Sequence, residues 1–597
     1  MKRIPAFLFC VSMAAAPPAS AKVRIEGELS RWSRVTLTFD GPQTSELATP
    51  NPFRDYRFSV TFTRAGGAKS YTVPGYFAAD GNAAGTSAQE GDQWRVHFVP
   101  DAAGEWRFRA SFRTGQDVAL SGDPNAGRPD AFDGASGVLR IRERNPKSGG
   151  ARAKGLLQYV GGHHFRYAGT GEYFLKGGAD SPENFLAYED FDGTYDADAG
   201  SGSYKEVGTF LHKYAPHVQD WRPGDPTWKG GKGKGIIGAL NYLASKGVNS
   251  VYFLTYNLDG GDGRDTWMWT DPETRDRFDV SKLEQWEIVF SHMDRLGIML
   301  HVVTQETEND DKLDGFGLSP IRKLYLRELC ARFSHHLALI WNLGEENDTP
   351  DAGRKEIARY IRSLDAYQHP ITVHSHNNRQ QKTYAGLYGD PFFEATSIQG
   401  NMENYNADAI LFRRLSAGAG RKWAVFGDEQ PPAHTGVLPD SVDPEHDAPR
   451  IQALWGNLIG GGAGVEWYFG SKYPHMDINL EDFRSRDRMW DQTRHALDFF
   501  RRYLPFWEMA PDNGLVTGAR DARALAKGDA LFAVQLPAGG EASLKLGAGS
   551  YSVRWYNPRA GGALQNGTVA SVTGPGVRSI GLPPRDTGKD WVALVKR

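Results

Sequence analysis

The sequence predicts three structural parts: an N-terminal β-sandwich, a central (β/α)8 TIM barrel and a small C-terminal β-sandwich. Three observations support this prediction. Alternating apolar residues mark short strands towards both ends of the chain, strands alternate with helices in the middle, and 597 residues exceed what one core usually holds. We place the parts at residues 22–145, 156–503 and 504–597, with a Gly/Ala/Lys-rich connection between the first two.

The first 21 residues have the pattern of a secretory signal peptide. A basic start at Met1–Arg3 precedes an apolar stretch, and the small residues Ala19–Ala21 form a cleavage site. The sequence therefore predicts a periplasmic or secreted protein whose mature chain begins near Lys22. No later stretch reaches about eighteen uninterrupted apolar residues, so no membrane anchor is expected. Cys330 is then the one remaining cysteine, and its helical pattern predicts a buried core position.

Composition narrows the class of partner. A net charge of −3 gives no excess of basic residues for a nucleic-acid surface, so no nucleic-acid partner is expected. A hydrophobic content of 40% with 16 Trp is typical of a folded globular chain rather than a disordered one. The oligomeric state is left open by these observations.

Both outer parts carry period-two strands bounded by Gly, Pro and Asp, which is the pattern of antiparallel sandwiches. In the N-terminal part the strands are expected at residues 35–39, 56–62, 93–99 and 105–112. In the C-terminal part they are expected at residues 530–536, 542–546, 551–556 and 591–595. Aromatic residues at alternating strand positions are expected mainly to fill the cores.

The middle part contains eight predicted strands separated by helical segments, which is the number that closes a barrel. The strands are expected at residues 173–176, 251–254, 298–303, 337–343, 371–374, 395–398, 423–426 and 464–469. One helix is expected to begin at Pro320 after Ser319, and another at a capping box of Ser281 and Glu284. An open doubly wound sheet is the alternative fold, but no Gly-rich phosphate loop follows any strand.

Acidic residues follow two of these strands. Strand four runs into Glu345 and Glu346, and strand seven ends in Asp428 and Glu429. Strands four and seven lie nearly opposite each other in an eight-stranded barrel, so these acids can face one another across its mouth. Hydrolysis of a glycosidic bond needs two carboxyl groups, one protonated and one ionised. A separation of about 5 Å predicts retention of configuration, and a separation of roughly 6.5 to 9.5 Å predicts inversion.

The segment Trp341–Asn347 resembles the end of strand four in the large retaining clan of (β/α)8 glycoside hydrolases. That clan carries an Asn-Glu pair at this place and a second Glu after strand seven. The resemblance implies that Glu346 is the acid/base and Glu429 the nucleophile of a retaining double displacement. The position of the clan's Asn is Glu345 in this chain, so the register between Glu345 and Glu346 stays open.

The motifs Ser181–Phe185, Asp190–Tyr195 and Trp341–Asn347 resemble those of bacterial apiosidase-like glycosidases. Members of that group place a sandwich of unassigned function before the barrel and a collagen-binding-type domain after it. The resemblance covers essentially the mature chain and implies a carbohydrate substrate. It names neither the sugar nor the anomer, the linkage, or an internal or terminal point of attack.

Ten residues at the predicted strand ends are expected to bind substrate. They combine aromatic rings that can stack on a sugar with polar side chains close to the two catalytic acids. They are Tyr256, Asn257, Trp267, Glu306, Glu345, Asn347, His374, His376, Asp428 and Trp467. Core packing is the alternative for Trp467, and a supporting role behind the nucleophile is the alternative for His374 and His376. No metal or other cofactor is expected, because strand five lacks a His-Glu-x-x-His helix.

Two other function classes remain open. Glu345 in place of Asn would also suit a carbohydrate-binding or cell-surface protein whose barrel has lost catalysis. A polysaccharide lyase acting on uronic acids would instead need a Tyr, His or Lys base and a neutralising Arg or metal. The absorbance of an unsaturated product would distinguish the lyase from the hydrolase.

Overall fold

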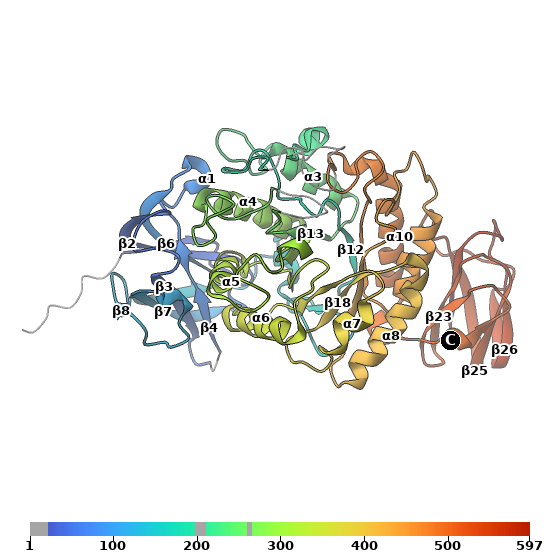
Figure 1. Ribbon diagram of the computed structural model, residues 1–597. Coiled ribbons are helices and arrows are strands. Elements are labelled where there is room, and N and C mark those ends of the chain that lie inside the picture. Colours follow the sequence, from blue (N-terminus) through green and yellow to red (C-terminus); the bar gives the residue numbers. More distant parts are fainter. Residues whose placement is uncertain (1–21, 68, 198–210, 259–264) are drawn as a thin grey trace, which may run out of the picture.

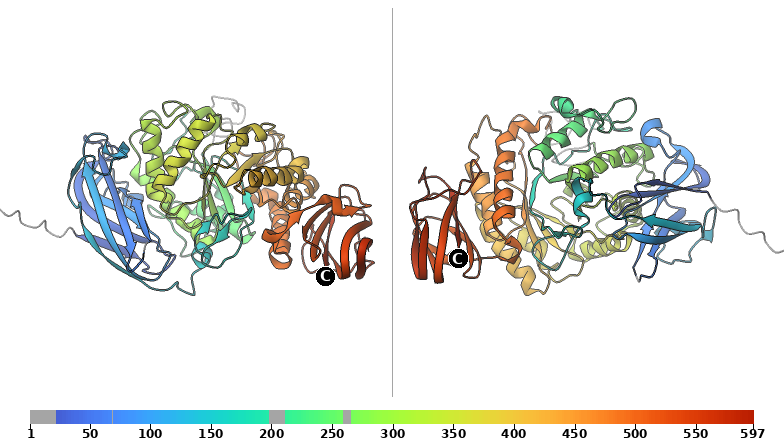
Figure 2. Two further views of the ribbon diagram at one scale, coloured as in Figure 1. Left: turned by 90° about the horizontal axis from the view of Figure 1, so that it is seen from below. Right: turned by 180° about the vertical axis from the view of Figure 1, so that it is seen from behind.

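The computed structural model describes residues 22–67, 69–197, 211–258 and 265–597. The predicted signal peptide, residues 1–21, lies outside the described residues. A central part of strands and helices lies between two β-rich parts, and the three views place these β-rich parts on opposite sides of it (Figures 1 and 2). The chain is therefore multidomain, with N-terminal sheets, a barrel-like centre and a C-terminal β unit.

The N-terminal part contains two antiparallel sheets. One sheet has the strands β1 (Val23–Gly27), β2 (Val35–Ser45), β6 (Glu90–Phe98) and β5 (Tyr76–Phe77). The other has β4 (Ser70–Pro74), β3 (Tyr56–Arg64), β7 (Gly104–Thr114) and β8 (Arg128–Pro129), with β9 (Ser136–Ile141) also paired to β7. The sheets pack face to face, since Phe39 of β2 meets Phe58 of β3 with ring centroids 5.3 Å apart. The four strands predicted here are confirmed.

The central part is built on a parallel sheet of nine strands. In chain order these are β12 (Lys176–Ala179), β13 (Ser250–Leu254), β14 (Met299–Val303), β15 (Leu339–Asn342), β16 (Ile371–Thr372), β17 (His374–Ser375), β18 (Ala395–Gln399), β19 (Ala424–Glu429) and β20 (Gly464–Trp467). The two ends of the sheet, β16 and β17, follow one another in the chain and are separated only by Val373. The sheet is thus nearly closed, with strand five split in two, and is consistent with a TIM-type barrel.

The first barrel strand lies three residues later than predicted. Tyr173 belongs instead to a bridge with Arg166 and stacks on Trp507, with ring centroids 4.7 Å apart. The strand itself is Lys-Gly-Gly-Ala, which lacks the apolar run expected of a buried strand. Gly178 is required there, because an added Cβ would lie 2.6 Å from Glu466 Cγ. The prediction of residues 173–176 is wrong in register because a charged residue and two glycines conceal the strand.

In the described residues of this central part, eight α-helices connect or follow the strands. They are α3 (Lys234–Ser245), α4 (Val280–Leu296), α5 (Pro320–Phe333), α6 (Asp351–Leu364), α7 (Gln380–Ala385), α8 (Tyr405–Gly418), α9 (Trp455–Ile459) and α10 (Asp487–Tyr503). Helix α5 begins at Pro320 as predicted, capped by Ser319. The predicted capping box is wrong, because Asp279 caps α4 and Glu284 pairs with Arg95 of the N-terminal part at 2.7 Å.

The C-terminal part has one hydrogen-bonded sheet of seven strands. These are β21 (Ala510–Pro511), β22 (Val516–Thr517), β23 (Arg523–Lys527), β24 (Leu531–Leu536), β25 (Ala542–Tyr556), β26 (Ser571–Gly581) and β27 (Trp591–Lys596). The two strands predicted at 542–546 and 551–556 are one long strand, β25. A sandwich would have two separate sheets, whereas hydrogen bonds join all seven of these strands into one sheet.

The cores show how the three parts are joined. The N-terminal sheets and the barrel share one buried apolar cluster, in which Phe53 meets Phe278 at 5.0 Å and Tyr71 meets Tyr367 at 5.8 Å. Cys330 is buried in the same cluster, as predicted. Most of the apolar interior of the C-terminal unit forms a separate cluster. Among the described helices, none is both long and apolar enough to cross a membrane.

Candidate active site

A sharp turn after β15 determines where the two consecutive glutamates point. Gly344 has φ 144°, and an added Cβ would lie 2.7 Å from Asn347 Nδ2, so glycine is required there. Glu346 has φ 37°, a left-handed conformation that is uncommon for a residue with a side chain. The N–H of Glu345 donates to Gln305 O at 2.8 Å. Glu345 is buried, whereas the side chain of Glu346 is 30% exposed.

The break in strand five places His374 against this turn. The N–H of His374 donates to the side-chain oxygen of Asn342 at 3.0 Å and to Gly344 O at 3.2 Å. Because strand five is interrupted at Val373, His374 hydrogen-bonds to Asn342 and Gly344 at the end of strand four instead of continuing the regular strand pairing. The buried imidazole ring is fixed between the tips of strands four and seven.

His374 lies between two buried carboxyl groups. Its Nδ1 is 2.6 Å from Glu345 Oε2, and its Nε2 is 3.6 Å from Glu429 Oε2. One side-chain oxygen of Glu345, one of Glu429 and a ring nitrogen of His374 all lie within 4.8 Å of one another. The two carboxyl groups that face each other across the end of the barrel are therefore Glu345 and Glu429.

Burial and like charge favour a protonated carboxyl group in this site. Burial raises the pKa of Glu345 well above its usual range, and the neighbouring carboxylates of Glu429 and Glu346 raise it further. Burial also lowers the pKa of His374 well below its usual range, helped by the nearby His301 and His376. A neutral imidazole beside a protonated carboxyl group follows from these two shifts.

The structure places Glu345 where the resemblance implies Glu346. Glu346 turns away from Glu429 and pairs with His376, whose Nδ1 lies 2.9 Å from Glu346 Oε2. His376 also contacts Asp348 at 3.1 Å, and the pKa of His376 is raised, mainly by its hydrogen bond to Glu346. Glu345 rather than Glu346 therefore faces Glu429. The physical reason is the turn at Gly344, which cannot be read from the order of the two glutamates.

Asp428 lies beneath the mouth in a fully buried ionic cluster. Lys176 Nζ is 2.5 Å from Asp428 Oδ1 and 2.9 Å from Glu466 Oε2, and His301 Nδ1 is 2.7 Å from the same Glu466 oxygen. Although burial opposes ionisation, Lys176 and His301 lower the pKa of Glu466 to about 2. Asp428 thus supports the strands rather than facing the mouth, contrary to the expectation that it binds substrate.

Replacing Lys176 with Met should destabilise the barrel by about 3 to 5 kcal/mol, because removing one partner leaves uncompensated buried charge. Urea unfolding followed by tryptophan fluorescence measures this loss. The matched control is Lys246→Met, which removes a lysine paired with Asp487 and Asp491 at the protein surface. That variant should lose no more than about 1 kcal/mol. Equal losses in the two variants would contradict the importance of the buried cluster.

Asp180 is a site residue that the sequence analysis missed. It follows β12 directly and is fully buried, and its carboxylate oxygens make no hydrogen bond within the described part of the chain. Burial raises the pKa of Asp180 well above its usual range, and the charges of Glu345 and Glu429 raise it further. A carboxyl group of this kind, at the end of a barrel strand, can hydrogen-bond a sugar hydroxyl. The misplaced strand one hid Asp180, because the end of that strand was expected three residues earlier.

Two of the predicted sugar contacts have structural roles instead. Trp467 is fully buried and donates from its indole N–H to Thr493 Oγ1 of α10 at 2.9 Å. It therefore lies between the sheet and a helix, which is the core-packing alternative. Asn347 donates to Asp310 at 2.8 Å and accepts from Arg354 Nε at 3.0 Å. These bonds hold the loop after β15 in place.

The remaining predicted contacts belong to the loops after β13 and β14, on the side of the barrel next to strand four. Asn257 accepts from Asn309 at 3.1 Å, and Tyr256 packs edge-on against Trp269 at 4.8 Å. The ammonium group of Lys282 lies over the ring of Trp267, 4.5 Å from the ring centroid. Glu306 is buried close by, where its N–H meets Tyr256 O at 3.4 Å. All four side chains are buried, so neither ring offers an open face on which a sugar could stack.

A pocket of about 340 Å³ lies beside the exposed edge of this site. His376, Asn347 and Arg379 line it, together with Asp348, Asp351 and Arg354. Within the described residues, Glu345, His374 and Glu429 also form one of the groups whose geometry suits a metal ion. Their chemistry equally suits hydrolysis of a glycosidic bond without a metal, since it supplies two carboxyl groups at close range.

Comparisons with known proteins agree with the fold. Residues 28–113 match the model of a family described as a domain of unknown function, DUF5060. No curated protein sequence matches the chain. A solved structure from Bacteroides vulgatus ATCC 8482, described as a candidate glycoside hydrolase, is 17% identical and has a TM-score of 0.64. That match covers 95% of this chain and 99% of the other.

Two further structures are similar over the larger part of the chain. A glycoside hydrolase family 5 structure from the same Bacteroides strain is 14% identical, with a TM-score of 0.51 and coverage of 74% of this chain and 93% of the other. A structure described as a glycoside hydrolase is also 14% identical, with a TM-score of 0.52 and coverage of 75% and 98%. The fold of this chain is therefore glycosidase-like.

Proposed function

We propose that this protein is an exported glycoside hydrolase that cleaves a poly- or oligosaccharide with retention of configuration. Glu429 is the nucleophile and Glu345 is the acid/base. The observation that carries the proposal is the approach of these two buried carboxyl groups to within 4.8 Å, with His374 between them. An approach this close between one oxygen of each acid fits the roughly 5 to 5.5 Å of retaining enzymes better than the roughly 6.5 to 9.5 Å of inverting ones.

The chemistry follows from the different environments of the two acids. Glu345 donates its proton to the glycosidic oxygen as the bond to the anomeric carbon breaks, and the Glu429 carboxylate attacks that carbon. The product of this step is a glycosyl ester of Glu429 and a free leaving group. Glu345, now ionised, removes a proton from water, which attacks the anomeric carbon and releases Glu429. Each carboxyl group ends in the state in which it began.

His374 positions the two acids and does not itself take part in bond breaking. Because the imidazole is neutral, its Nδ1 can accept a hydrogen bond from the protonated carboxyl group of Glu345 at 2.6 Å, while its Nε2–H faces Glu429 at 3.6 Å. This arrangement keeps the proton on the acid and a partial positive charge near the nucleophile. Asp180, with Tyr256, Asn257, Trp267 and Glu306 in the neighbouring loops, forms the proposed walls of the sugar site.

The predicted export, the domain boundaries and the C-terminal sandwich are also part of this proposal. Export depends on the pattern of residues 1–21, and the proposed boundaries are 22–145, 156–503 and 504–597. A C-terminal sandwich and the narrower likeness to apiosidase-like glycosidases are supported by the motifs and the three-part order. The proposed substrate is a carbohydrate, and no nucleic-acid partner is proposed.

The experiment that tests the function is a screen of the mature chain against plant, algal and bacterial polysaccharides and aryl glycosides. Released reducing sugar that disappears in both Glu345→Gln and Glu429→Gln would support the hydrolase. Binding without turnover across the panel would favour a carbohydrate-binding protein. A product absorbing in the near ultraviolet would favour a lyase. Proton NMR of the first product formed shows whether configuration is retained.

The pH profile should report the protonation of Glu345. The acid works only when protonated, so activity is present below its pKa and is lost as the pH rises through that pKa. Because the pKa is raised well above the usual range of a glutamate, activity should persist to higher pH than an ordinary glutamic acid would allow. Profiles of kcat/KM for the parent and Glu345→Gln measure this. An alkaline decline that is unchanged in the variant would contradict the role of Glu345.

A further inference from the structure

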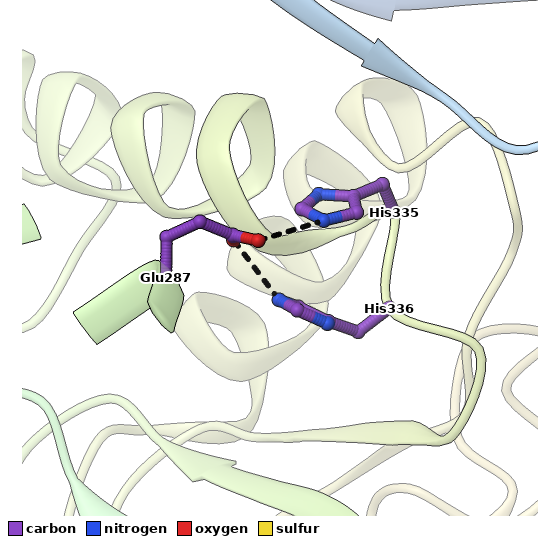
Figure 3. Close-up of side chains that lie close together, drawn as sticks. All are labelled: Glu287, His335 and His336. Carbon is purple, nitrogen blue, oxygen red and sulfur yellow. Dashed lines mark hydrogen bonds and ion pairs between the residues drawn. The ribbon is translucent and has the colours of Figure 1, made fainter. Parts of the chain in front are cut away.

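A second cluster of metal-ligating side chains lies outside the candidate active site. Glu287 projects from α4, and His335 and His336 lie in the turn just after α5 (Figure 3). Figure 3 shows both imidazole rings directed towards the Glu287 carboxylate. His335 Nε2 is 3.3 Å from Glu287 Oε1, and His336 Nε2 is 3.1 Å from Glu287 Oε2. The three side chains come from two helical elements that pack side by side.

The spacing of these atoms suits a small divalent cation. One ligand atom from each residue lies within 4.8 Å of the other two. A tetrahedral zinc ion with bonds of about 2.0 to 2.1 Å separates its neighbouring ligand atoms by roughly 3.3 Å. Each imidazole lies near that spacing from the Glu287 carboxylate, His335 from Oε1 at 3.3 Å and His336 from Oε2 at 3.1 Å. Two imidazoles and one carboxylate are also ligands that zinc takes in proteins.

The surroundings of the two histidines provide independent support. His336 Nδ1 is 2.8 Å from Asp294 Oδ2, which is the outer carboxylate contact that commonly orients a metal-binding histidine. His335 is 4% exposed and contacts Glu287 through Nε2, while its Nδ1 makes no hydrogen bond within the described residues. A metal ion between the two side chains would replace this 3.3 Å contact by a direct bond to each of them.

An adjoining cavity offers both a path and a further ligand. A cavity of about 470 Å³ lies between the N-terminal sheets and α4, and Glu287 and His97 are among its lining residues. The ring of His97 packs against that of His335 with centroids 4.5 Å apart. Arg34 reaches from the N-terminal part to Glu287 Oε1 and to Ser291 Oγ. Water in this cavity can complete the coordination while Arg34 remains an outer partner of the carboxylate.

We propose that Glu287, His335 and His336 bind one divalent transition-metal ion of the zinc type, with water from the cavity as the fourth ligand. The site does not depend on the proposed hydrolase activity. Its ligands come from α4 and the turn after α5, while Arg34 and His97 of the N-terminal sheets contact those same ligands. The ion therefore reinforces the junction between the N-terminal part and the barrel.

Metal content and thermal stability of the full mature chain test this proposal. The protein, without a histidine tag, is loaded with Zn²⁺, freed of excess ion, and analysed by mass spectrometry for bound metal. We expect about one ion per chain, lost in His335→Gln and His336→Gln but kept in His292→Gln, a buried histidine of α4 outside the cluster. Zn²⁺ should also raise the Tm of the parent and of His292→Gln, and EDTA should reverse the rise.

Two further measurements keep the test decisive. Zinc that persists in the His335→Gln variant but is lost in His374→Gln would overturn the proposal, because it would place the ion at the candidate active site. If a cluster variant fails to fold, the visible absorption of Co²⁺ added to the parent reports tetrahedral coordination directly. A parent that binds neither Zn²⁺ nor Co²⁺ would also overturn it, leaving Glu287 and the two histidines as a metal-free ion-pair cluster.

Discussion

Glu429→Gln should lower kcat on any active substrate by on the order of 10⁴-fold or more, because it removes the group that forms the covalent bond. The amide keeps the shape of the side chain, so sugar binding and the melting temperature should change little. Glu429 is buried and lies at the end of β19, so its backbone is fixed by the sheet. Initial rates, calorimetric binding and thermal unfolding measure the three quantities.

The matched control for this variant is Glu403→Gln, an exposed acid that follows strand six. It should retain full activity. Azide adds a sharper test of the role of Glu429, because a small anion can take the place of a deleted nucleophile. In Glu429→Gly it should restore turnover and give a glycosyl azide of inverted configuration. Full activity in Glu429→Gln, or a rescued product of retained configuration, would remove Glu429 from this role.

Glu345→Gln should lower kcat by about 10² to 10⁴-fold, the usual contribution of a general acid. The loss in kcat/KM should be largest on substrates with poor leaving groups and small on dinitrophenyl glycosides, whose departure needs no protonation. On those activated substrates kcat should still fall, because hydrolysis of the glycosyl ester needs Glu345 as the base. Glu346→Gln is the matched control, because it changes the neighbouring residue that pairs with the partly exposed His376. We expect that control to keep activity within about tenfold of the parent, as for a residue outside the reacting pair.

This pair of variants decides between the two registers. A loss in kcat/KM that is equal on natural and activated substrates in Glu345→Gln, together with a leaving-group-dependent loss in Glu346→Gln, would return the acid to Glu346. The parent and both variants should share one melting temperature within a few degrees. A large loss of stability in Glu345→Gln would show that the carboxyl group is structural, since His374 would then lose a partner at 2.6 Å.

The order of strands and helices was predictable because hydrophobic periodicity records burial. The N-terminal strands and most barrel strands carry that pattern directly, and Ser319 and Pro320 mark a helix start by their chemistry. The failure at β12 has the opposite cause. Lys176 can be buried because it pairs with Asp428 and Glu466. Both partners lie far away in sequence, so no local sequence pattern predicts the pairing.

The candidate site was predictable in its chemistry and less so in its geometry. Acids at the ends of strands four and seven indicated the mouth of the barrel, and His374 was expected beside them. Which of Glu345 and Glu346 faces inward depends on the positive φ angles of Gly344 and Glu346, which are properties of the folded turn. Trp467 shows the same limit, since a strand alternates its faces and the register of β20 decided its direction.

The buried apolar clusters indicate which parts of the chain recombination could exchange. The N-terminal sheets share their interior with the barrel through contacts such as Phe53 with Phe278, so they cannot be exchanged without remaking that surface. The C-terminal unit keeps most of its own interior. It is therefore the more portable part of the protein, although its removal would expose the surface where Tyr556 and Leu594 join the cluster of the barrel.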